Sequence, residues 1–237
     1  TTGYNINNNG GIMNYDMMNN NKLSLTGKIA APLVFTHEVL GEGFYETRLE
    51  VKRLSGQSDV IPLTVSDRLI AGYDFGEGDT ITVEGQFRSH NKVEGGRSRL
   101  VLTAFARDVI YPADESINPN LLEVSGYICK KPVYRVTPFN REICDVLLAV
   151  NRAYNKSDYI PCILWGRSAR YVKDLPVGTK VSMWGRIQSR VYNKAAEDGS
   201  VEERVAYEFS VNRFKVEGAS DENGRHEDES QNTAKLL

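Results

Sequence analysis

The sequence is poor in the residues that build metal centres and covalent cross-links. Among 237 residues there are three cysteines and three histidines, and no two cysteines form a Cys-x-x-Cys pair. This spacing excludes a zinc set of closely spaced ligands, so we expect reduced thiols, no metal and no cofactor. A Ser/His/Asp or Cys/His arrangement is also missing, which argues against an enzyme.

Long apolar runs are missing as well. The first 21 residues contain eight asparagines and no hydrophobic stretch of the kind that a signal peptide or a membrane span requires. We therefore expect a cytoplasmic protein that does not enter a membrane.

An excess of positive charge is absent overall, since the net charge is −2. The distribution is uneven, however. Residues 116–216 carry 16 basic and 10 acidic side chains, whereas residues 22–115 carry 11 basic and 14 acidic ones. A locally basic segment suits contact with phosphates, although an ordinary basic surface has the same composition.

The body of the chain alternates apolar and polar residues in short segments broken by Gly, Pro, Asn and Asp, which predicts strands. In the second half we expect strands at residues 122–128, 143–151, 159–165, 180–190 and 204–214. A short helix is expected at residues 168–175, ended by Pro176 and Gly178. The predicted fold is all-β, with five-stranded barrels and a short helix between strands 3 and 4.

The first half repeats the second at a lag of about 100 residues. The segment SDVIP at residues 58–62 recurs as SDYIP at 157–161, and GQFRS at 85–89 recurs as GRIQS at 185–189. We predict two domains of one fold, at residues 22–112 and 122–217, joined by a linker at 113–121. The Asn-rich residues 1–21 and the acidic residues 218–237 are expected to be disordered.

Aromatic and basic side chains share one predicted sheet face. Alternation places Tyr159 and Trp165 opposite Ile160, Cys162 and Leu164, which form the natural core face. The next strand adds outward Trp184, Arg186, Gln188 and Arg190. Rings interleaved with arginines can stack unpaired bases while guanidinium groups hold the phosphate backbone. Packing is the competing explanation for each single ring.

Four segments of the second half resemble the bacterial single-stranded DNA-binding proteins. They are PVYRVTP at 132–138, LAVNR at 148–152, DYIPCILWGR at 158–167 and GRIQSRVY at 185–192. The resemblance implies an OB barrel and four base-stacking rings, here Tyr154, Tyr159, Trp165 and Tyr192. Further expected DNA contacts are Trp184, Arg135, Arg152, Lys156, Arg167, Arg186, Gln188 and Arg190.

The first copy departs from this set, because Val60, Ser66 and Lys92 stand where the second copy has Tyr159, Trp165 and Tyr192. We expect a degenerate stacking set there, with weaker DNA contacts from Arg53, Arg88 and Lys92. Some relatives with two OB domains assemble as dimers, so the resemblance implies a homodimer, which we place at the first domain.

The resemblance implies sequence-independent binding and protection of single-stranded DNA in replication, recombination or repair, in the nucleoid. RNA stays open as a ligand. Replication and repair proteins are implied partners, although the tail lacks the terminal Pro-Phe that recruits them in this family. The alternatives are a tandem-OB interaction module of a replication-restart or mobile-element complex, and a nuclease built on an OB barrel.

Overall fold

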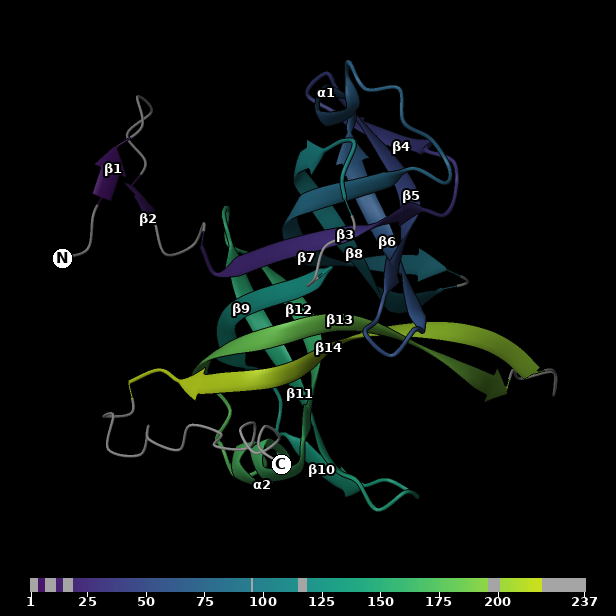
Figure 1. The fold of residues 1–237 in the computed structure, drawn as a ribbon. Helices are drawn as coiled ribbons and strands as arrows, with labels where there is room; N and C mark the ends of the chain where they lie inside the picture. Colours follow the sequence, from purple (N-terminus) through teal and green to yellow (C-terminus); the bar gives the residue numbers. More distant parts are fainter. Residues whose placement is uncertain are drawn as a thin grey trace, which may run out of the picture.

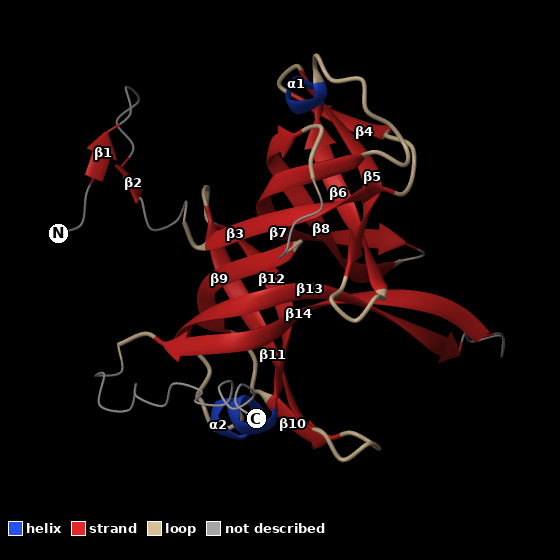
Figure 2. Ribbon diagram, viewed as in Figure 1, coloured by secondary structure: helices blue, strands red, loops and turns tan. Residues whose placement is uncertain are grey.

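The computed structural model describes residues 4–6, 12–14, 19–94, 96–114, 119–195 and 201–218. Strands dominate the described part, and they form two barrels of the same design (Figures 1 and 2). The predicted all-β class is therefore confirmed. Among the described residues, no helix has the length and apolar character needed to cross a membrane.

The first barrel consists of six strands and one short helix. In chain order these are β3 (Asn21–Ile29), β4 (Val34–Val39), β5 (Glu42–Lys52), β6 (Ser58–Ser66), α1 (Asp67–Ile70), β7 (Thr80–Glu94) and β8 (Arg97–Ile110). Before it, β1 (Tyr4–Ile6) and β2 (Ile12–Asn14) pair antiparallel. The prediction of disorder at residues 1–21 and 218–237 concerns mainly residues that lie outside the described part.

The second barrel repeats this order with the same number of elements. They are β9 (Asn120–Ile128), β10 (Val133–Val136), β11 (Glu142–Arg152), β12 (Lys156–Trp165), α2 (Gly166–Val172), β13 (Lys180–Ala195) and β14 (Val201–Val216). The five expected strands are present, and each barrel has a sixth, β4 or β10, which the sequence patterns did not indicate. The helix begins two residues before the predicted start and ends at Val172, ahead of Pro176.

The two barrels are joined through a continuous sheet of twelve strands. The joint is the antiparallel pair β3–β9, in which Leu23 lies opposite Leu122. These residues are repeat counterparts, and both are buried. A register that pairs a residue with its own counterpart is what a two-fold axis requires, so the barrels are related by an internal pseudo-two-fold at this point. The helices α1 and α2 accordingly lie at opposite ends (Figure 1).

Two buried aspartates connect the barrels away from the β3–β9 joint. Asp59 of β6 accepts hydrogen bonds from the backbone N–H and the hydroxyl of Ser189 in β13, at 2.6 and 3.0 Å. At the position related to this one by the pseudo-two-fold, Asp158 of β12 accepts a hydrogen bond from the backbone N–H of Ser89 in β7 at 2.8 Å. Repeated polar pairing of this kind fixes the relative position of the two barrels.

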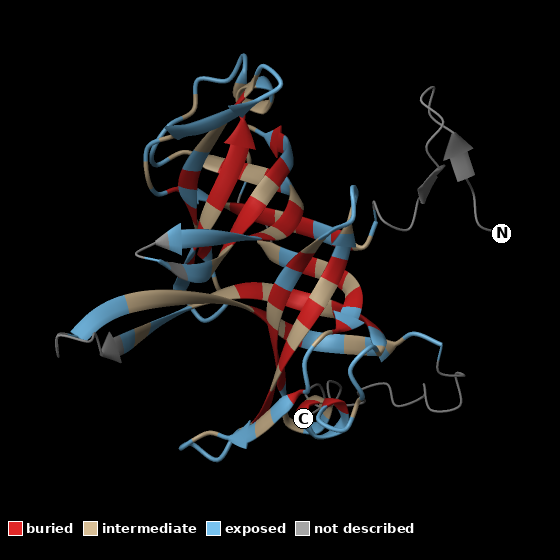
Figure 3. Cartoon of the chain, turned by 180° about the vertical axis from the view of Figure 1, so that it is seen from behind, coloured by how far each residue is buried: buried red, intermediate tan, exposed pale blue. Residues whose placement is uncertain are grey.

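The core of each barrel comes from the inward positions of its strands, visible as alternating buried bands in Figure 3. Close packing requires glycine at matching positions of the two barrels. A Cβ at Gly85 or Gly185 would lie 2.1 Å from the carbonyl oxygen of Phe105 or Ser210, respectively. Both glycines sit at a β-bulge that lets β7 and β13 bend around the barrel.

Candidate nucleic-acid interface

Strand β12 has a core face, as its sequence pattern predicts, and a second face that is exposed at Tyr159 and Trp165 but buried at Ile163. Ile160, Cys162 and Leu164 point inward and are at most 3% exposed. Tyr159 and Trp165 lie on the other face and are 43% and 36% exposed. Burial therefore does not account for these two rings, and each presents aromatic surface to solvent.

Trp165 is held at the last position of β12, immediately before α2. Its indole N–H donates to the hydroxyl of Ser210 on β14 at 3.3 Å. Across the sheet it pairs with Ile143 of β11, which is 2% exposed. A tethered ring over an apolar support is preorganised for stacking, because little rotamer freedom remains to be lost on binding.

Tyr154 occupies the turn between β11 and β12 and is 89% exposed. Its φ of +61° and that of Asn155, +54°, form the tight turn that projects the ring beyond the sheet. Lys156 follows at the start of β12 and is also exposed. The turn thus carries an aromatic ring and a cation outward together.

The remaining two rings lie on the long hairpin of β13 and β14, which extends well beyond the barrel (Figure 1). Tyr192 is near its tip, with the Arg190 guanidinium 5.7 Å from the ring centroid. Trp184 is near its base, with the Arg213 guanidinium 4.3 Å from the ring. The sequence patterns did not single out Arg213, because its closeness to Trp184 depends on the cross-strand pairing of β13 with β14.

Most of the predicted arginine contacts are engaged within the protein. Arg135 pairs with Asp145 at 2.6 Å, Arg190 pairs with Glu208 at 3.1 Å, and Gln188 donates to Glu208 at 3.3 Å. Arg167 and Lys156 are exposed and form no ion pair with any residue that the structure describes. These two are the cations most accessible to a phosphate.

Arg152 and Arg186 sit at the junction of the barrels. Arg152 pairs with the buried Asp158 at 3.2 Å, and Arg186 approaches Asp59 of the first barrel at 3.5 Å. Burial lowers the pKa of Arg186, as does the nearby charge of Arg53. Both arginines therefore neutralise buried carboxylates, a structural role that their sequence positions did not reveal.

The residues predicted to contact DNA weakly from the first barrel behave similarly. Arg53 donates to Asp59 and reaches the carbonyl of Ser189 at 3.3 Å. Arg88 lies over the ring of Phe105, and burial lowers its pKa to about 10. Lys92 is exposed on β7. At the positions of the stacking rings, Val60 is 36% exposed and Ser66 is buried.

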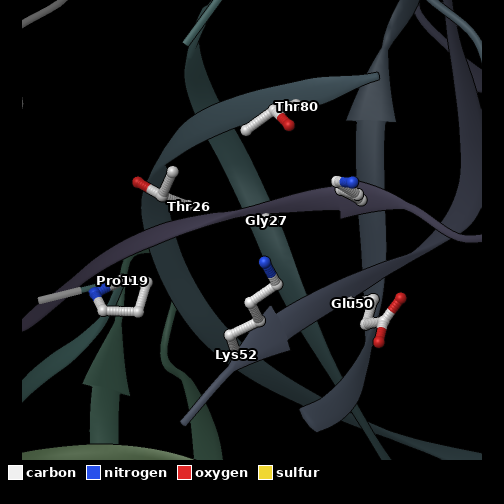
Figure 4. Close-up of a pocket in the computed structure, with 7 residues that line it drawn as sticks. Thr26, Gly27, Glu50, Lys52, Thr80 and Pro119 are labelled. Carbon is white, nitrogen blue, oxygen red and sulfur yellow. The ribbon is translucent and has the colours of Figure 1, made fainter. Parts of the chain in front are cut away.

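Three hollows lie in the described part of the chain, and two of them differ sharply in size. One, of about 60 Å³, is bounded by Thr26, Gly27, Glu50, Lys52 and Pro119 among others (Figure 4), and it is far smaller than a typical small-molecule site. The other, of about 540 Å³, separates β5 and β8 from β14 and mixes arginines with glutamates. No group of three or more metal-ligating side chains occurs among the described residues.

Known proteins resemble the second barrel in sequence. The model of the Single-strand binding protein family matches residues 119–216, which comprise the second barrel. Single-stranded DNA-binding protein 1 of Staphylococcus aureus is 34% identical over 80 residues, 31% of this chain and 48% of the relative. The chain thus spans about half the length of that relative.

A second relative is matched over more of its length. Single-stranded DNA-binding protein 3 of Streptococcus agalactiae is 31% identical over 100 residues, 39% of this chain and 72% of the relative. Among solved structures, the single-stranded DNA binding protein from Thermus aquaticus matches with a TM-score of 0.61 at 18% identity. The match covers 83% of this chain and 92% of that one. The predicted tandem OB fold is thereby confirmed.

Proposed function

Because the chain belongs to the single-strand binding protein family, we propose that it binds and protects single-stranded DNA, irrespective of sequence, during replication, recombination or repair. Members of this family are DNA-binding proteins without enzymatic activity. The observation that carries the proposal is the outward placement of Tyr159 and Trp165 on a strand whose other face is fully buried.

The proposed mechanism combines stacking with phosphate contact. Bases stack on Tyr154, Tyr159, Trp165 and Tyr192, since every base offers a π-face and stacking needs no sequence readout. Arg167 and Lys156 contact the backbone, and Arg190 and Arg213 place positive charge beside Tyr192 and Trp184. Arg135, Arg152, Arg186 and Gln188 support the surface through their pairs within the protein.

We also propose a homodimer formed through the first barrel. Strand β3 is already paired with β9, so its edge is unavailable to a second copy. Strand β4 is at one end of the twelve-stranded sheet, and all six of its residues are exposed, including Val34 and Val39. An edge strand of this kind can pair with its copy around a two-fold axis. Light scattering should give about twice 26.6 kDa, and Val34→Lys with Val39→Lys should give a monomer.

Tryptophan fluorescence tests the DNA-binding proposal. Adding oligothymidine at low salt should quench emission from Trp165, and the quenching should persist in Trp184→Phe and largely vanish in Trp165→Phe. Affinity should fall steeply with salt, with a slope of log affinity against log salt of roughly −0.7 per neutralised phosphate. A flat salt response or a preference for duplex would overturn the proposal and favour the interaction-module alternative. Equal affinity for oligouridine would extend the ligand class to RNA.

A further inference from the structure

The first barrel carries its own row of stacked side chains on its outward face. His37 of β4 stacks on Phe44 of β5, with ring centroids 5.1 Å apart and planes 13° from parallel. Phe44 in turn lies 5.9 Å from Phe105 of β8. The Arg88 guanidinium of β7 is 3.7 Å from the centroid of Phe105. We call these four side chains the first-barrel row.

The first-barrel row lies near the position that corresponds to Trp165 in the second barrel. Its ring Phe105 is on β8, the strand next to β6, which is the counterpart of β12. Phe105 pairs with Thr64 and Gln86, just as Ser210 pairs with Ile163 and Arg186 in the second barrel. Phe105 is therefore the counterpart of Ser210, and Ser66 is the counterpart of Trp165. Each barrel therefore has one large ring and one serine at these two positions. In the first barrel the serine is on β6 and the ring on β8, whereas in the second barrel the ring is on β12 and the serine on β14.

The small side chain of Ser66 makes the row possible. Ser66 pairs with Phe44 across β5 and β6 and is only 4% exposed. With no ring on β6, Phe44 and Phe105 approach each other over that strand. Both rings stay partly exposed, whereas the neighbouring inward residues Ala104 and Ala106 are buried. The rings accordingly form a surface layer above the core.

Positive charge at the end of the row exceeds the negative charge near it. The Arg88 guanidinium interacts with the charges of Arg107, Arg152 and one carboxylate, the buried Asp158, which already pairs with Arg152. Arg88 and Arg107 both donate to the amide oxygen of Gln86, at 2.9 and 3.1 Å. Neither arginine forms an ion pair within the described part of the chain. A neutral amide and the single carboxylate of Asp158 cannot balance the three guanidinium charges, so this corner favours an anion such as a phosphate.

We propose that the first-barrel row is a second binding site for unpaired nucleotides, with bases on Phe44 and Phe105 and a phosphate at Arg88 and Arg107. This inference rests on the proposed function of the chain. It replaces the expectation of a barrel without stacking rings by one in which the rings have moved to β5 and β8. One DNA strand that engages both barrels then gains affinity through effective concentration.

Two single-tryptophan proteins test the inference. In the first, Trp184→Phe leaves Trp165 as the reporter. In the second, Trp165→Phe and Trp184→Phe are combined with Phe105→Trp, which moves the reporter to the first barrel. Oligothymidine of roughly 40 nucleotides exceeds two OB sites of up to about 16 nucleotides each. We expect quenching of both reporters at saturation.

The outcomes separate the two proposals. Quenching at position 165 without quenching at position 105 overturns the second site and leaves the proposed function standing. Quenching at neither position overturns both. Should Phe105→Trp disturb folding, Phe105→Leu in the otherwise natural chain gives an independent measurement.

Phe105→Leu keeps apolar volume and removes a stacking ring. Affinity for the same oligonucleotide should fall roughly 5- to 150-fold, the equivalent of one lost stack. The matched control is Tyr73→Leu, which removes a 44% exposed ring that contacts Phe75 and Tyr111 instead of the row. Equal affinities of these two variants would refute the site.

Discussion

The carboxylate of Asp59 in one barrel accepts two hydrogen bonds from Ser189 in the other, from the backbone N–H at 2.6 Å and from the hydroxyl at 3.0 Å. The same carboxylate receives the Arg53 guanidinium, and its side chain is fully buried. One acidic group thus satisfies donors from both barrels, which makes the position of the second barrel dependent on a residue of the first.

Asp59→Ala should destabilise the folded protein by about 3–5 kcal/mol, because it leaves a half-buried guanidinium and a buried N–H without their acceptor. Urea unfolding at neutral pH measures the loss. The control is Asp145→Ala, which breaks a pair with Arg135 whose members are both more than 40% exposed and should cost only about 0–1 kcal/mol. Similar costs for the two variants would contradict the bridging role.

Asp59 and its counterpart Asp158 should respond to pH in opposite directions. Burial by itself would raise the pKa of Asp59, but the hydrogen bonds from Arg53 and Ser189 outweigh it and lower the pKa. For Asp158 burial prevails over the Ser89 N–H and the Arg152 charge, so its pKa is raised. The stabilisation from Asp59 is therefore complete above the unfolded pKa and is lost as pH falls through the folded one.

For Asp158 the sign is reversed: its contribution is complete below the unfolded pKa and is lost as pH rises through the folded value. Between about pH 7 and pH 2, the cost of Asp59→Asn should consequently shrink once the pH falls below about 4, while the cost of Asp158→Asn should grow as the pH falls towards about 4. Urea unfolding of both variants and the natural chain across this range measures the two slopes. Slopes of equal sign would show that the barrels do not differ in this way.

Trp165→Ala should reduce affinity for oligothymidine by about 1–3 kcal/mol and leave the melting temperature nearly unchanged, because the ring is on the solvent face. Leu164→Ala, one residue away, removes a side chain with no exposed surface and should cost about 2–5 kcal/mol of stability. Oligothymidine affinity and melting temperature, measured on both variants, should show that Trp165→Ala affects mainly binding and Leu164→Ala mainly stability. A large drop in melting temperature for Trp165→Ala would identify the ring as packing.

The sequence predicted the all-β class, the two-fold repeat and the outward faces of β12, because alternation and repeated motifs are local signals. The sixth strands β4 and β10 were missed, since Val34–Val39 and Val133–Val136 lie at sheet ends without a buried face. The pairing of Arg186 with Asp59 could not be predicted from the sequence either, because it depends on the relative position of the two barrels.

The first-barrel row was not predicted from the sequence, for a different reason. Motif repeats gave a lag of 99 or 100 residues, but strand pairing relates Phe105 to Ser210 at a lag of 105. A simple lag therefore compared Phe105 with the wrong residue. The pairings of β8 with β6 and β7, and of β14 with β12 and β13, reveal that the ring and the serine have exchanged strands.

This exchange predicts strong coupling between positions 66 and 105. Ser66→Trp alone places a large ring where Phe44 and Phe105 already meet, and overpacking of this kind costs about 1–3 kcal/mol. Phe105→Ser alone exposes the space that the ring fills. The triple variant, which adds Phe44→Ile to these two substitutions, reproduces the Trp165, Ser210 and Ile143 combination of the second barrel. Its loss of stability should fall short of the sum of the three single losses by about 0.5–3 kcal/mol. Urea unfolding of the full cycle measures this coupling. Additive losses would mean that the two barrels do not share interchangeable surface layers.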